Sequence, residues 1–136
     1  MFRFAFSRAI AAALLLGFAT FAAQAQKDDS GILGGYDLWI GQQDLYNSRG
    51  ERLTEFWQVI RQDRANYHRF GRGDPQDDWD PYFADAGNRA WLERSLQGMT
   101  ISDAAESRIL SGNVRVRLEL RGVGDRLTGV ALAVYD

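Results

Sequence analysis

The strictest pattern in this sequence is an alternation of apolar and charged residues near its C-terminal end. Four apolar side chains hold every second position and charged ones fill the gaps: Val114, Val116, Leu118 and Leu120 against Arg115, Arg117, Glu119 and Arg121. A period of two is typical of a strand with one buried face. A Gly-containing turn at 122–125 and a second alternating run over 127–135 follow. The sequence therefore predicts a C-terminal β-hairpin that must pack against another layer.

Three helical segments are predicted to supply that layer. The first spans 54–70, where the apolar side chains fall in one stripe about 100° wide and Thr54 is placed to cap the helix. The second spans 86–97, with Asp85 as its N-cap and Gly98 available for a left-handed exit. The third is short and ends at Gly112.

Two shorter patterns precede the helices. Tyr36, Leu38 and Ile40 alternate with Asp37 and Trp39, which predicts a short half-buried strand. The turn residues at 47–50 then indicate a small hairpin before the first helix. The predicted fold class is α+β: a small antiparallel sheet, made of an N-terminal strand or hairpin and the C-terminal hairpin, packed against two or three helices.

The N-terminus has the three parts of a secretory signal peptide. Arg3 and Arg8 form the positive end, an apolar run covers 9–23, and small residues flank Gln24 at the cleavage site. The apolar run is shorter than the roughly 20 residues that cross a bilayer. We therefore expect cleavage after Ala25, a periplasmic or secreted product, a mobile leader over 26–35 and a single domain over 36–136. No transmembrane segment is expected in the mature chain.

Composition limits how this domain holds together and what it binds. The sequence has no cysteine, which excludes disulfides and a lipid-anchored signal peptide, so packing alone must stabilise the domain. Asp plus Glu outnumber Lys plus Arg by 18 to 16, and cleavage would also remove Arg3 and Arg8. Nucleic acid is a poor partner for such a chain, because phosphate binding needs a concentrated positive face.

Asp63 is the weak catalytic candidate, because it falls within the apolar stripe of the first helix. A carboxylate buried there without a partner would have a raised pKa and could act as an acid or base. The favoured interpretation is structural, with Asp63 bonded to an arginine or to backbone N–H groups. His68, the one histidine, lies away from the stripe and is predicted to be a solvated surface residue.

The segment that follows the first helix is acidic, and we call residues 74–85 the acidic loop. Four of its aspartates come close to the spacing of an EF-hand calcium loop: Asp74, Asp78, Asp80 and Asp85. Trp79 occupies the position that needs glycine in such a loop, so the match is poor. The favoured prediction is a solvated loop in which the aspartates pair with Arg69, Arg72 and Arg89, and in which millimolar calcium has little effect.

Several functions remain open from the sequence. The favoured one is an exported binding or interaction module without catalysis, whose partner is a protein or a cell-envelope component. The alternatives are a calcium-dependent module that uses the acidic loop, and a hydrolase of cell-envelope polymer that uses Asp63 with an acidic-loop carboxylate. Trp79 and Tyr82, aromatic residues in a polar loop, are the candidate ligand-binding residues. No cofactor is expected apart from calcium.

Overall fold

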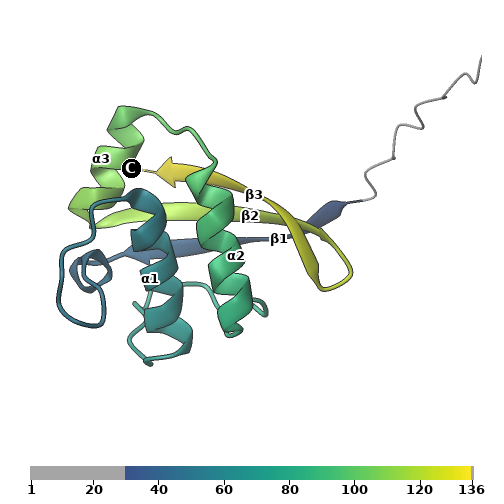
Figure 1. The fold of residues 1–136 in the computed structure, drawn as a ribbon, viewed down its shortest axis with the longest axis horizontal. Helices are drawn as coiled ribbons and strands as arrows, with labels where there is room; N and C mark the ends of the chain where they lie inside the picture. Colours follow the sequence, from purple (N-terminus) through teal and green to yellow (C-terminus); the bar gives the residue numbers. More distant parts are fainter. Residues whose placement is uncertain (1–29, 136) are drawn as a thin grey trace, which may run out of the picture.

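The computed structural model describes residues 30–135, so the predicted signal peptide, its cleavage site and residues 26–29 of the leader lie outside it. Within this range the chain forms a sheet and helices in a simple order (Figure 1). The elements are β1 (Gly31–Ile40), the 3-10 helix η1 (Gln42–Leu45), α1 (Phe56–His68), α2 (Ala86–Gln97), α3 (Asp103–Ser111), β2 (Val114–Val123) and β3 (Arg126–Tyr135). None of the helices in residues 30–135 has the length and apolar character needed to cross a membrane.

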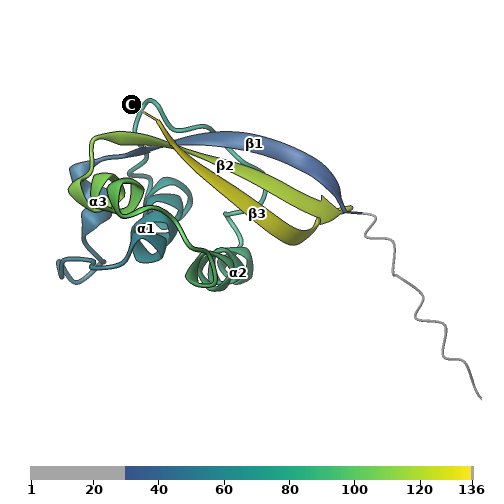
Figure 2. The same ribbon diagram turned by 90° about the horizontal axis from the view of Figure 1, so that it is seen from above.

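The sheet is antiparallel and has the strand order β1-β2-β3. Ile40 pairs with Val114 at one end of β1 and Gly31 pairs with Gly122 at the other. Figure 2 shows that α1, α2 and α3 all lie on the same side of the sheet. Residues 30–135 therefore form two layers, one sheet and one set of helices, which confirms the predicted α+β class.

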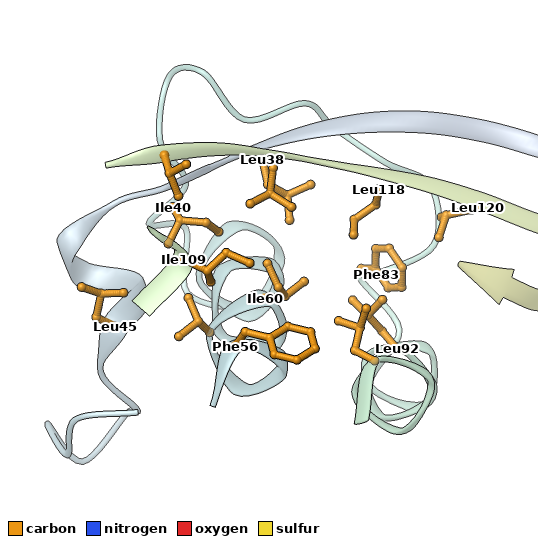
Figure 3. Packing of buried hydrophobic residues seen from close by; sticks show 14 of the residues in the cluster. Leu38, Ile40, Leu45, Phe56, Ile60, Phe83, Leu92, Ile109, Leu118 and Leu120 are labelled. Carbon is orange, nitrogen blue, oxygen red and sulfur yellow. The ribbon is translucent and has the colours of Figure 1, made fainter. Parts of the chain in front are cut away.

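The core lies between these two layers (Figure 3). The four apolar residues of the β2 alternation are all buried, as the period of two predicts. They face fully buried side chains from the helices and from the end of the acidic loop: Val59, Ile60, Phe83, Leu92, Leu96 and Ile109. Complete burial of each such side chain stabilises the fold by roughly 1.5 to 3 kcal/mol. The burial of these apolar side chains can therefore hold the domain together without disulfides.

Strand β1 begins inside the segment that the sequence predicts to be a mobile leader. Residues 31–35 pair with β2, so the leader prediction is wrong for this part of 26–35. The physical reason is that the glycines make room for neighbouring side chains. A Cβ atom at Gly35 would lie 2.4 Å from the Arg117 guanidinium, which crosses the strand at that point. Glycine here indicates close packing on a strand and not a flexible linker.

The helix ends differ slightly from the prediction. Helix α1 begins at Phe56 with Glu55 as its N-cap, and the side chain of Gln58 accepts hydrogen bonds from the N–H groups of Thr54 and Glu55. The side chain of Gln58 therefore satisfies backbone N–H groups at the start of α1, where Thr54 was predicted to be the cap. The cap of α2 is confirmed, because Asp85 accepts from the Asn88 N–H at 2.8 Å. Gly98 remains right-handed, with φ −80°, so the left-handed exit predicted there is wrong.

Candidate functional site

The centre of the polar interior is an arginine that sequence analysis did not single out. Arg64 is completely buried and follows Asp63 on α1. Its Nε donates to Asp63 at 2.8 Å, and its Nη1 donates to the Asp80 carboxylate at 2.8 Å and to the Asp78 carbonyl at 3.0 Å. Asp63 is therefore a structural carboxylate bonded to an arginine, as the favoured interpretation predicted, and the partner is its own neighbour in the chain.

Asp80 is also buried, and it is the best satisfied carboxylate of the acidic loop. It accepts from the N–H groups of Tyr82 and Phe83 at 2.9 and 2.7 Å, and its second oxygen lies 2.8 Å from His68 Nε2. Burial alone would raise the pKa of Asp80, but the hydrogen bonds from His68, Phe83, Arg64 and Tyr82 outweigh it and leave the pKa lowered. Asp80 is thus held as a carboxylate in the interior.

The prediction of a solvated His68 is wrong, because only 6% of its side chain is exposed. His68 lies four residues after Arg64, so both side chains project from the same part of α1 toward the loop. This i, i+4 relation was the signal available in the sequence. The apolar stripe alone does not reveal it, because the inward face of α1 extends beyond the stripe to polar side chains.

The acidic loop also runs along the open edge of β1. The Asp77 carboxylate accepts from the Trp39 N–H at 2.7 Å, and the Asp78 carboxylate accepts from the Asp37 N–H at 2.8 Å. In return the Asp78 N–H donates to the Asp37 carbonyl at 2.8 Å. These bonds satisfy backbone groups that an edge strand would otherwise present to another chain.

A second group of carboxylates meets beside Arg64, and we call Asp44, Asp63 and Asp74 the aspartate triad. One oxygen from each lies within 4.8 Å of the other two. Asp44 accepts from the Gly41 N–H and from Asn66 Nδ2, both at 2.8 Å. Asp63 Oδ1 and Asp74 Oδ2 are buried and have no hydrogen-bond partner among the described residues.

Burial dominates the electrostatics of the aspartate triad. It raises the pKa of Asp44 to about 6, although the bonds from Asn66 and Gly41 act in the opposite direction. It also raises the pKa of Asp63 well above its usual range, and the neighbouring Arg64 offsets this only in part. Asp44 was missed by sequence reasoning because η1 is too short to show a periodic pattern.

The four predicted calcium ligands are not brought together. Asp78 bonds to β1, Asp80 bonds to Arg64, and Asp85 caps α2. Only Asp74 reaches the aspartate triad. The EF-hand spacing therefore does not produce an EF-hand arrangement in this chain.

The predicted arginine partners of the acidic loop also differ from the observed one. Among residues 30–135, the ion pairs with its carboxylates Asp77 and Asp80 come from Arg64, and not from Arg69, Arg72 or Arg89. Arg89 instead donates to the carbonyls of Phe83 and Ala84 at 2.7 and 3.1 Å. The loop is arginine-paired, as predicted, but through a buried residue of α1.

The two aromatic binding candidates have different environments. Trp79 is 66% exposed, as a ligand-stacking residue would be. Tyr82 is partly buried and packs edge-on against Tyr36, with ring centroids 6.2 Å apart. Tyr82 therefore belongs to the periphery of the core, and of the two candidates only Trp79 offers its ring to solvent.

A cleft among the described residues lies elsewhere, between the 46–52 turn and α1. This cleft has a volume of about 310 Å³ and is lined mainly by polar side chains: Gln43, Tyr46, Asn47, Ser48, Gln62, Asn66, Phe70 and Arg72, with Gly50. The described residues that line it include no carboxylate and no imidazole. Tyr46 and Phe70 are each 40% exposed, so two aromatic rings stand at its rim.

Comparison with known proteins gave no matching family model, no matching curated protein and no matching solved structure.

Proposed function

We propose that the protein is an exported binding module without catalysis of its own, and that it recognises an acidic oligosaccharide of the cell envelope in the cleft beside α1. The observation that carries this proposal is the composition of the cleft. Planar amides, a hydroxyl, a guanidinium and two exposed rings line it, and groups that transfer protons near neutral pH are missing from the described lining.

The amides are held in place before any ligand arrives. Asn66 donates to Asp44 at 2.8 Å and accepts from Gln62 Nε2 at 2.9 Å. Across the cleft, Gln43 Nε2 donates to the Arg72 carbonyl. Side chains fixed in this way lose little conformational entropy on binding, which favours affinity for a ligand rich in hydroxyl groups.

The two aromatic rings and the Arg72 guanidinium indicate which other groups the ligand carries. Arg52 stacks over the Tyr46 ring at 5.3 Å and Arg69 stacks over the Phe70 ring at 5.1 Å, which fixes the ring orientations. The Arg72 guanidinium has no carboxylate partner in the part of the chain that is described. A guanidinium without a partner suits a carboxylate or phosphate on the ligand, and the rings suit the C–H faces of sugars.

A hydrolase is the less favoured alternative. Glycoside hydrolysis needs two carboxyl groups that flank the substrate. Asp63 is 1% exposed and bonded to Arg64, so it reaches no substrate in the cleft.

The test is a binding assay of the purified exported protein against acidic and neutral oligosaccharides, with product analysis after long incubation. We expect selective binding of acidic ligands without cleavage, and a loss of at least tenfold in affinity in Arg72→Gln and in Tyr46→Ala. Arg49→Gln is the matched control, because Arg49 is exposed on the same turn but pairs with Glu51 outside the cleft. Cleavage of the ligand, or equal binding by Arg72→Gln and Arg49→Gln, would overturn the proposal.

A further inference from the structure

We propose that the aspartate triad binds a hard divalent cation of the size of calcium, and that this ion joins η1, α1 and the acidic loop. The proposed site differs from the EF-hand-like spacing of the acidic loop, with which it shares only Asp74. It goes beyond the proposed function, because it lies in the interior and not among the residues that line the cleft.

Two observations point to a ligand at this position. One oxygen each from Asp44, Asp63 and Asp74 lies within 4.8 Å of the others. Independently, Asp63 is 99% buried and its Oδ1 has no hydrogen-bond partner among residues 30–135, as is also the case for Asp74 Oδ2. Buried carboxylate oxygens in native proteins are almost always satisfied, so two orphans beside a third carboxylate call for a positive group.

Arg64 is shared among several carboxylates, because it pairs with Asp63, Asp77 and Asp80. Arg64 bonds to Asp63 through Oδ2, and Oδ1 takes no part in that bond. Its Nη1 donates to Asp80 and to the Asp78 carbonyl, while Nη2 has no hydrogen-bond partner among the described residues and lies 3.7 Å from Asp77 Oδ1. Like charges within 5 Å of one another in a poorly hydrated interior repel strongly. A divalent cation between the three carboxylates removes this repulsion.

The donor set selects the kind of cation. All three ligands are carboxylates, with no histidine or cysteine among them, which favours Ca²⁺, Mg²⁺ or Mn²⁺ over softer metals. Oxygens on opposite sides of a Ca²⁺ ion, at about 2.4 Å each, lie about 4.8 Å apart, whereas the span for Mg²⁺ is about 4.2 Å. The three oxygens lie within 4.8 Å of one another, which is no more than the span across a Ca²⁺ ion, and Ca²⁺ gives up its water ligands more readily than Mg²⁺ does.

Gly41 is the positioning residue of the proposed site. Its N–H holds the Asp44 carboxylate at 2.8 Å. A Cβ atom at this glycine would lie 3.0 and 3.2 Å from the two Asp74 oxygens, closer than a side chain normally approaches. Glycine at this position therefore lets Asp44 and Asp74 come together.

The first test compares thermal unfolding of the purified protein in EDTA and in calcium or magnesium at pH 7.5, with calorimetric titration of Ca²⁺ to obtain Kd. An ion that binds only the folded state raises Tm by roughly ten degrees at about a hundred times Kd for a domain of this size. We expect this rise with Ca²⁺ and a smaller one with Mg²⁺. An unchanged Tm and no heat of binding up to 10 mM Ca²⁺ would overturn the proposal.

Variants then assign the response to the aspartate triad. Asp74→Asn and Asp63→Asn should each abolish the calcium response. In EDTA, Asp74→Asn should melt no lower than the wild type, because it also removes repulsion, whereas Asp63→Asn should melt lower, because it also weakens the buried pair with Arg64. The double variant Asp78→Asn plus Asp85→Asn is the matched control, since it changes only the EF-hand-like set. Its calcium response should persist. A response lost in the control and kept in Asp74→Asn plus Asp63→Asn would refute the triad as the site.

Discussion

The guanidinium of Arg64 and the carboxylate of Asp80 meet at 2.8 Å, and neither side chain is exposed to solvent. One comes from α1 and the other from the acidic loop, so this contact fixes the loop on the helix. A buried ion pair stabilises a fold only while both partners are present, because a single partner leaves an uncompensated charge in the interior.

Arg64→Met should therefore destabilise the protein by at least about 3 to 5 kcal/mol, since Asp63 and Asp80 would both lose their guanidinium. Urea unfolding measures this effect. Arg61→Met is the control on the same helix, because Arg61 pairs with Glu93 at the surface and its loss should cost about 1 kcal/mol or less. Equal effects in the two variants would contradict the structural role of Arg64.

Val116→Asp should unfold the domain, because Val116 is completely buried in the central strand and an unpaired charge there costs several kcal/mol. The control is Arg121→Asp, an exposed change on the same strand that should stay within about 0.5 kcal/mol. Arg117→Asp is a poorer control, because Arg117 bonds to Asp37 across the sheet at 2.9 Å. Similar thermal melts for Val116→Asp and Arg121→Asp would rule out a one-sided sheet.

In EDTA, the free energy of unfolding should fall as the pH rises from about 4 to 6. The pKa of Asp44 is about 6 in the folded protein and 3.8 in its ordinary state, so the folded state binds more protons in this window. The raised pKa values of Asp63 and Asp77 act in the same direction, while the lowered pKa of Asp80 acts only below about 3.8. Asp44 alone accounts for a loss on the order of 2 to 3 kcal/mol.

The variant that checks this is Asp44→Asn, which should flatten the dependence of stability on pH between 4 and 6. Urea unfolding at a series of pH values gives the slope directly. A slope in Asp44→Asn as steep as that of the wild type would show that the carboxyl of Asp44 is not the group responsible.

Gly122→Ala should destabilise the protein by about 1 to 3 kcal/mol or more, as overpacking does. A Cβ atom at Gly122 would lie 2.1 Å from the Arg126 carbonyl oxygen, at the point where the register of β2 and β3 shifts. Gly129→Ala is the matched control on β3, where the nearest atom would be 3.7 Å away, an ordinary contact. Thermal melts of the two variants should differ clearly, and equal melts would contradict the close approach at Gly122.

The parts of the fold that follow from local periodicity could be predicted from the sequence. The alternation around Val116 determines which face of β2 is buried, and the burial of Asp63 follows from its position in the stripe of α1. Both depend only on the geometry of a single strand or helix.

The polar interior could not be predicted in the same way, because its contacts join separate elements. Nothing local marks Arg64, rather than Arg72, as the partner of the acidic loop, and nothing marks Asp44 as the neighbour of Asp74. The same holds for the hydrogen bonds from the loop to β1. These bonds depend on the path by which the chain returns to the sheet after α1. The spacing of residues along the sequence does not indicate that path.

The position of β1 in the sheet has a consequence for the order of folding. Within residues 30–135 this strand pairs with β2 alone, and even its nearest partners, Ile40 and Val114, are separated in the sequence by α1, α2 and α3. Such distant contacts form slowly, because a long loop must close before any hydrogen bond is gained. We expect the β2–β3 hairpin to form first and β1 to dock afterwards. If the chain is exported, as we propose, its N-terminal strand would stay unfolded until the last strands have been synthesised, and an unfolded chain can pass through a translocation channel.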